Sequence, residues 1–277
     1  MRVRLSSVFF ALGAVLAGAM LAGAVTLYAG FYNVSATQPH MPATYRVLDL
    51  ALRASIAQHA QDIEVPPLVD ANLERGRILY HGHCVQCHGA PGVAPEPFAL
   101  GLAPLPANLA YVGRERPAAE IFWVIRNGIK MTGMPAWQFR LTESELWAVT
   151  AFVMQLPLIS PVEYAGGTKA APAVPTRTAE PAVGAGDPHR GRLALKQYAC
   201  TTCHHIPHVE GDGAPVGPPL DRIATRQYLA GVLPNTHANM VRWLRAPQQV
   251  TPRTAMPDLG VTERDARDMA AYLYTLR

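Results

Sequence analysis

The chain has 277 residues, of which 49% are apolar and 16% charged, so it is long enough and apolar enough to build two ordinary domains. Its 24 Lys and Arg residues against 20 Asp and Glu residues give a formal charge of +4, with no basic run and no basic stripe interleaved with aromatic residues. The composition excludes a wholly disordered chain and gives no support for nucleic-acid binding.

The first predicted element is a membrane-spanning helix. Arg2 and Arg4 precede an almost wholly apolar run from Val8 to Tyr32, and a helix of about 25 residues crosses a hydrocarbon core of about 30 Å. By the positive-inside rule, residues 1–32 should anchor the chain with its N-terminus in the cytoplasm and the rest outside it. A cleaved signal peptide is the alternative, because small-residue sites such as Ala22-Gly23-Ala24 occur. Secretory apolar segments are usually shorter, about 7–15 residues.

Residues 33–71 are predicted to form a juxtamembrane amphipathic helix and a connector. Apolar residues recur at helical spacing between Thr44 and Ile63, and Pro66-Pro67 then ends the pattern. Packing of this helix on the first folded domain is the simpler interpretation. A position on the membrane surface is the alternative, which is disfavoured because the polar face is not strongly basic.

The remainder of the chain repeats one unit twice, in residues 72–158 and 187–277. Each unit has a short helical stretch, a Cys-x-x-Cys-His sequence, a Pro/Gly-rich loop, a middle helix with a tryptophan and a Met-Pro pair, in that order. Each closes with a helix that begins at a Thr-Glu pair, which is typical of a helix cap. Residues 159–186 between the units are rich in Pro, Ala and Gly, which predicts an extended or flexible linker.

The four cysteines of the chain form two pairs, and each pair is followed at once by a histidine. These residues are Cys84, Cys87 and His88 in the first unit, and Cys200, Cys203 and His204 in the second. This is the c-type haem attachment signature: two thiols on one turn add to the two vinyl groups of a porphyrin, and the histidine faces the iron. A zinc site or a thioredoxin-like site fits less well, because the pairs are far apart and no strand pattern surrounds them. We therefore predict two covalently bound haem c groups.

The sixth ligand of each iron should come from the Met-Pro loop of its unit. Met134 is preferred over Met131, because a glycine before Met134 permits close backbone approach and a proline after it stiffens the loop. Met131 is expected to pack nearby or to lie beside the haem edge. Met256 occupies the corresponding place in the second unit, whereas Met240 lies at helical spacing with apolar neighbours and is expected in the core.

Each proximal histidine needs an acceptor for its other ring N–H, normally a backbone carbonyl. For His204 we expect this carbonyl in the loop of residues 217–220. For His88 we expect it at Pro104 or Pro106.

Two glycines on the opening helices, Gly76 and Gly191, are expected to let an aromatic side chain of the closing helix approach closely. The candidate aromatic residues are Trp147, Phe152 and Tyr272. Four further histidines flank the attachment sites: His81, His83, His205 and His208. Solvent exposure is the simpler interpretation for them, and alternative iron ligation or proton coupling is the other.

These motifs resemble those of class I cytochromes c over about residues 72–157 and 187–277. The resemblance implies an all-α fold, in which an N-terminal transmembrane helix precedes two class I cytochrome c domains in tandem. It also implies three to five helices around each haem and the axial pairs His88/Met134 and His204/Met256. The stretch from Gly231 to Met256 resembles the cytochrome c domain fused to subunit II of caa3-type oxidases. The layout of the whole chain is similar to that of the dihaem subunit of cbb3-type oxidases.

An iron with both axial positions filled has no open site for a substrate, which favours electron transfer over catalysis. We therefore expect a dihaem cytochrome at the inner membrane, with its haem domains in the periplasm, that carries single electrons in a respiratory chain. The expected donor is a quinol-oxidising complex or a dehydrogenase, and the expected acceptor is a terminal oxidase or reductase. A dihaem redox enzyme, peroxidase-like or sulfur-compound oxidising, with one labile haem ligand is the alternative.

Overall fold

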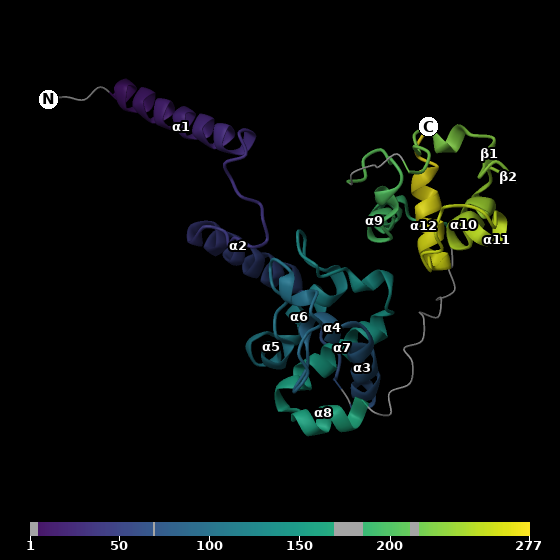
Figure 1. The fold of residues 1–277 in the computed structure, drawn as a ribbon, viewed down its shortest axis with the longest axis horizontal. Coiled ribbons are helices and arrows are strands. Elements are labelled where there is room, and N and C mark those ends of the chain that lie inside the picture. Colours follow the sequence, from purple (N-terminus) through teal and green to yellow (C-terminus); the bar gives the residue numbers. More distant parts are fainter. Residues whose placement is uncertain (1–4, 69, 169–184, 211–215) are drawn as a thin grey trace. The chain divides into compact units, whose positions relative to one another are not determined.

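The computed structural model describes residues 5–68, 70–168, 185–210 and 216–277 (Figure 1). The chain divides into two compact units, Met1–Ala54 and Ser55–Arg277. The described residues are mostly helical, and their strands are a two-residue antiparallel pair, β1 (Tyr228–Leu229) and β2 (Leu233–Pro234). The prediction of an all-α fold is confirmed.

The N-terminal helix α1 (Leu5–Tyr28) matches the predicted apolar run. Over Val8–Tyr28 its mean hydropathy is 2.3, and among the helices in the described part of the chain it is the candidate for a membrane span by length and composition. Helix α2 (Pro42–Ala60) follows, close to the predicted amphipathic helix. Within α2 the buried side chains are Ile56 and Ala60.

The first cytochrome-like region packs a helix from its start against a helix from its end. Its elements are α3 (Asp70–His83), α4 (Val85–His88), η1 (Ala99–Gly101), α5 (Leu109–Glu115), α6 (Ala118–Asn127), η2 (Trp137–Phe139), α7 (Glu143–Gln155), η3 (Leu156–Leu158) and α8 (Pro161–Thr168). Helix α7 begins at a capping box in which Thr142 and Glu145 satisfy each other's backbone N–H groups. In the core, the rings of Phe122 and Trp147 stack with centroids 3.9 Å apart.

Helix α8 is a difference from the predicted linker, whose middle residues 169–184 lie outside the described residues. The helix forms because Ser160 and Glu163 make a capping box, with Ser160 N–H donating to Glu163 Oε2 at 2.7 Å, and Pro161 occupies the first helical position. Tyr164 is 2% exposed and joins the core of this region. The folded region therefore continues through α8.

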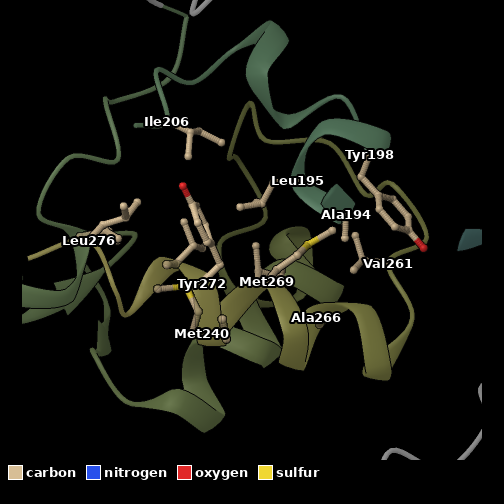
Figure 2. Packing of buried hydrophobic residues seen from close by; sticks show 14 of the residues in the cluster. Ala194, Leu195, Tyr198, Ile206, Met240, Val261, Ala266, Met269, Tyr272 and Leu276 are labelled. Carbon is tan, nitrogen blue, oxygen red and sulfur yellow. The ribbon is translucent and has the colours of Figure 1, made fainter. Parts of the chain in front are cut away.

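The second cytochrome-like region has the same order of parts. Its elements are α9 (Pro188–Gln197), η4 (Cys200–Thr202), η5 (Ile223–Thr225), β1, β2, α10 (His237–Arg245), α11 (Pro247–Val250) and α12 (Glu263–Leu273). Figure 2 shows its core, where Leu195 of α9 and Met240 of α10 gather around Met269 and Tyr272 of α12. Met240 is 2% exposed, which confirms its predicted place in the core.

The opening and closing helices of each region cross at a glycine. A Cβ on Gly76 would lie 2.0 Å from the carbonyl oxygen of Ala148, and one on Gly191 would lie 1.9 Å from that of Asp268. The prediction that these glycines admit close approach is confirmed, but the nearest atoms belong mainly to the backbone of the closing helix rather than to an aromatic ring. The Cβ of Phe152, 2.9 Å from an added Cβ on Gly76, is the aromatic contribution among them. The two helix backbones can come this close because glycine has no side chain at the point of contact.

An arginine precedes each of these glycines and pairs with an acid on the closing helix. Arg75 bonds Glu145 on α7, and Arg190 Nε lies 2.8 Å from Asp268 Oδ2 on α12. The Asp268 side chain is 4% exposed, so this pair is shielded on one side from water. The ion pair and the glycine therefore lie at the same crossing of the opening and closing helices, and the attachment sequence follows each opening helix.

Candidate haem sites

Each attachment sequence forms a single tight turn that follows its opening helix, directly in the first region and after Tyr198 and Ala199 in the second. The His88 N–H donates to the Cys84 carbonyl at 2.9 Å, and the His204 N–H donates to the Cys200 carbonyl at 3.0 Å. Both thiols and the histidine of each motif therefore lie on one turn, as attachment to one porphyrin requires. Burial raises the pKa of the Cys84 thiol to about 12 and that of Cys200 to about 11. Such apolar surroundings suit the hydrocarbon edge of a haem.

The second attachment turn contains one residue more than the first between the helix glycine and the first cysteine. The extra residue is Ala199, whose φ of 55° places it in the left-handed region. A non-glycine residue there carries strain. Helix α3 ends at His83, directly before Cys84, whereas α9 ends at Gln197, so Ala199 lies in the connection between α9 and the second Cys-x-x-Cys-His turn. The sequence pattern shows the extra residue but not how the backbone absorbs it.

The two candidate proximal histidines are each held by a backbone carbonyl, as predicted. His204 Nδ1 lies 2.8 Å from the Pro218 oxygen, inside the expected loop of residues 217–220. His88 Nδ1 lies 2.7 Å from the Ala107 oxygen, which corrects the expectation of Pro104 or Pro106 by one residue. A carbonyl oxygen can only accept, so Nδ1 carries the proton in both rings and Nε2 keeps its lone pair for iron. Burial also lowers the pKa of His88, which favours the neutral ring that binds a metal.

The loop that carries Pro218 also touches the face of the His204 ring. A Cβ on Gly217 would lie 2.4 Å from His204 Cε1 and 2.7 Å from Nδ1. The backbone at this position therefore lies flat against the imidazole and fixes its plane. The Gly-Pro pair in the sequence is the signal that identifies this contact.

In the first region, Met134 lies in a short loop in which hydrogen bonds link residues 129, 132 and 134 to one another. The Met134 N–H donates to Thr132 Oγ1 at 3.0 Å, and the Thr132 hydroxyl donates to the Ile129 carbonyl at 2.8 Å. The Ile129 N–H in turn donates to the Met134 carbonyl at 3.2 Å. Gly128, with a φ of 67°, lies where a Cβ would touch the Met134 carbonyl oxygen at 2.7 Å. The half-buried Met134 side chain packs on the core of this region.

The Met256 loop shares the threonine two residues before its methionine. The Met256 N–H donates to Thr254 Oγ1 at 3.2 Å, and Gln248 Nε2 donates to the Met256 carbonyl at 2.6 Å. Met256 itself is half-buried against the core of the second region. The repeated Thr-x-Met-Pro sequence was the available signal for these threonines, whereas the role of Gln248 depends on a fold contact that the sequence pattern does not show.

One polar atom in the Met256 loop has no partner in the protein. The Thr251 hydroxyl oxygen is buried and, among the described side chains, is the buried polar atom without a hydrogen bond. A buried hydroxyl without a partner is costly, so such a group is expected to bond to something outside the protein chain. A haem carboxylate or a water molecule next to this loop would supply a hydrogen-bond partner for the Thr251 hydroxyl.

The other candidate residues lie apart from this arrangement. Met131 is 95% exposed, so it does not pack in the core. His83 is half-buried with its ring 5.1 Å from that of Trp137, and His81 Nδ1 lies 3.2 Å from the Tyr164 hydroxyl. His205 is exposed and pairs with Asp221 at 3.1 Å, and His208 is exposed.

The residues at both sites fit a c-type haem. Each site offers two thiols on one turn, an imidazole whose Nε2 is free to bind and a half-buried thioether on a hydrogen-bonded loop. An imidazole and a thioether are the axial ligand types of electron-transfer haems, and a covalent haem supplies an iron that cycles between two oxidation states. In the described residues no cluster of three or more His, Cys, Asp and Glu side chains suggests another metal.

Comparison with known protein families gave two matches. Residues 71–153 match the family described as cytochrome c oxidase, cbb3-type, subunit III. Residues 189–277 match the family described as cytochrome c. A comparison with curated proteins gave no match.

Proposed function

We propose that this chain, which carries two cytochrome c domains in tandem and two covalently bound haem c groups, is a membrane-anchored electron carrier of a periplasmic respiratory chain. It would accept electrons from a quinol-oxidising complex or a dehydrogenase and deliver them to a terminal oxidase or reductase. Cytochrome c domains imply electron transfer and redox protein partners; the respiratory setting and these partners are the proposal.

One observation carries the proposal: both sites have an oriented imidazole and a hydrogen-bonded thioether loop. Two ligands on each iron leave no open position for a substrate, so the group is suited to exchange electrons with a docked protein. The axial pairs that we propose are His88 with Met134 and His204 with Met256. The paired loops also weigh against a dihaem enzyme, which needs one labile position.

The location of the carrier is proposed from α1. Its apolar length suits a single membrane span, and the arginines before it favour a cytoplasmic N-terminus. Haem domains on the far side would then face the periplasm, close to partners in the same membrane. Tethering raises their effective concentration near those partners without any new contact.

Carbon monoxide binding to the fully reduced, haem-loaded protein tests the proposal. Carbon monoxide needs an open iron position, so we expect no change in the visible spectrum of the unmodified protein. A change equivalent to one haem would show a labile site and would favour the dihaem enzyme instead.

Methionine variants make the test specific to each site. Met134→Ala and Met256→Ala should each open one haem to carbon monoxide, and the double variant should open both. Met131→Ala is the matched control, because Met131 lies three residues from Met134 but is 95% exposed. Binding that appears in the Met131 variant, and not in the Met134 variant, would reverse the ligand assignment.

A further inference from the structure

Helix α2 exposes a large apolar surface whose residues belong to neither haem site. Five large apolar side chains in its first three turns are exposed: Tyr45 61%, Val47 66%, Leu48 53%, Leu50 68% and Leu52 37%. All of α2 lies in the described part of the chain, and within α2 only Ile56 and Ala60 are buried. Contiguous apolar surface of this kind marks a binding surface for a protein or a membrane.

The charged residues of α2 are confined to one narrow strip. At about 100° of rotation per residue, Arg46, Asp49 and Arg53 fall within about 60° of one another on the helix. Arg53 Nε and Asp49 Oδ2 lie 2.8 Å apart, as expected for neighbours on this strip. The five exposed apolar side chains occupy the remaining circumference. A helix with an apolar arc this wide is normally covered over most of its circumference.

The part of α2 that already has a partner lies on the charged side. Viewed down the helix axis, its two buried residues, Ile56 and Ala60, lie within about 20° of the charged strip. The last turn meets the first cytochrome domain, where the His59 ring lies 5.5 Å from that of Trp123. The centre of the apolar arc is therefore on the side of the helix opposite to Ile56 and Ala60.

The connection to α1 limits where this apolar arc can be. Residues 29–41 join the two helices, and a chain of this length spans at most about 45 Å when fully extended. Tyr28 is 98% exposed and Phe31 77% exposed at the start of this connection. Aromatic side chains there suit the boundary between lipid and water. If α1 spans the membrane, the start of α2 stays close to the outer surface of the same bilayer.

We propose that α2 lies along the outer surface of the bilayer, with Val47, Leu48 and Leu50 in the acyl boundary and the charged strip toward water. The occupant of the apolar arc is lipid, because the arc is wide and is tethered next to the membrane span. These two observations outweigh the weakly basic polar face, which in the sequence alone argued against a membrane surface. The inference rests on the proposed membrane anchor. It adds a second membrane contact, next to α1 and directly before the first haem domain in the chain.

Spin labelling of the full-length, haem-loaded protein in phosphatidylethanolamine–phosphatidylglycerol liposomes tests this. The four native cysteines hold haem, so a label attaches only to one introduced cysteine. We expect labels at Val47→Cys and Leu50→Cys to collide with oxygen and to be shielded from a water-soluble nickel complex. The matched control Arg46→Cys, one residue from Val47 but on the charged strip, should show the reverse, with a several-fold difference in the ratio of the two collision rates.

Equal nickel accessibility at positions 46, 47 and 50 would overturn the inference. Shielding of the Val47 and Leu50 labels from both reagents would also overturn it, because a protein surface would then cover the helix. A label at Leu16→Cys in α1 separates this failure from failure of the anchor. Nickel-accessible Leu16 would refute the membrane span itself, whereas shielded Leu16 with accessible Leu50 would refute only the placement of α2.

Discussion

At the second haem site, the backbone of Gly217 lies against the face of the proximal ring, since an added Cβ would come within 2.4 Å of His204 Cε1. We predict that Gly217→Ala pushes the ring or the Pro218 carbonyl out of place. Overpacking of this kind costs about 1–3 kcal/mol. A redox titration should show a shifted midpoint potential for one haem of the two. Gly101→Ala is the control, because a Cβ there meets nothing within 4 Å, and a shift of both potentials would contradict the prediction.

The threonines in the two methionine loops, Thr132 and Thr254, differ in the number of hydrogen bonds that their hydroxyl groups make. Thr132 joins both the Met134 N–H and the Ile129 carbonyl, whereas Thr254 accepts from the Met256 N–H. A neutral hydrogen bond contributes about 1 kcal/mol. We therefore predict that Thr132→Val lowers the denaturant concentration at which methionine leaves the iron by more than Thr254→Val does.

The methionine–iron charge-transfer band follows this loss during a urea titration. Thr132→Ser keeps the hydroxyl and should behave as the unmodified protein. Equal effects of the two valine variants would show that the second hydrogen bond of Thr132 contributes nothing to the loop.

Sequence patterns predicted the parts of the haem sites that depend on local chain order. The cysteines, the proximal histidines and the Met-Pro loops are each defined within a few residues, so their spacing identifies them. The carbonyl that holds His88 belongs to Ala107 rather than to a neighbouring proline, because the path of an irregular loop decides which oxygen points inward. The unpaired Thr251 hydroxyl is likewise a matter of burial, which no local pattern contains.

At the scale of elements, the crossing of the opening and closing helices depends on one glycine in each domain. Gly76→Ala and Gly191→Ala would each place a Cβ about 2 Å from a backbone carbonyl oxygen. We predict that each substitution lowers the free energy of unfolding by about 3 kcal/mol, the upper end of the usual cost of overpacking, because two helix backbones must separate. Gly166→Ala in α8 is the helical control, since a Cβ there meets nothing within 4 Å and alanine favours a helix.

Denaturant unfolding followed through haem absorbance measures both variants and the control. If Gly76→Ala proves as stable as Gly166→Ala, the close crossing of α3 and α7 is not what holds these helices. The start of α8 was itself predictable, because Ser160-Pro161-Val162-Glu163 is a capping-box sequence with proline at the first helical position. The Pro/Ala/Gly composition of the surrounding segment hides that signal when the segment is considered as a whole.

The cap of α7 gives the first domain a dependence on pH. Burial raises the pKa of Glu145, but hydrogen bonds from Thr142 and Arg75 lower it more, so its pKa in the folded state is below 4.5. A carboxyl with a depressed pKa stabilises the fold above its unfolded pKa, and this contribution is lost as pH falls below 4.5 through the folded value.

We therefore predict that Glu145→Gln lowers the unfolding free energy near neutral pH by about 1 kcal/mol and has a smaller effect in acid. Urea unfolding of the two proteins across this pH range measures the difference. Glu143→Gln is the matched control on the same helical turn, since Glu143 is exposed. A constant difference between the Glu145 variant and the unmodified protein at every pH would contradict the ionic role of Glu145.

For the whole molecule, the question is what holds two haem domains near their partners. The two proposed membrane contacts differ in strength: a spanning helix such as α1 inserts in effect irreversibly, whereas an interfacial helix such as α2 binds reversibly. We predict that α1 is retained and that an alkaline carbonate wash leaves the haem-stained chain in the membrane fraction. Mass spectrometry should then find a mature chain that still contains residues 5–28.

Replacing α1 with a cleavable signal peptide separates the two contacts. This variant should keep both haems and associate with membranes through α2 alone, so the carbonate wash should release it. A native chain that is released in the same way, and whose mass begins after Ala24, would show that the N-terminal helix is a leader and not an anchor. The first haem domain would then owe its place at the membrane to α2, and the supply of electrons to a partner would depend on the concentration of the protein in the periplasm.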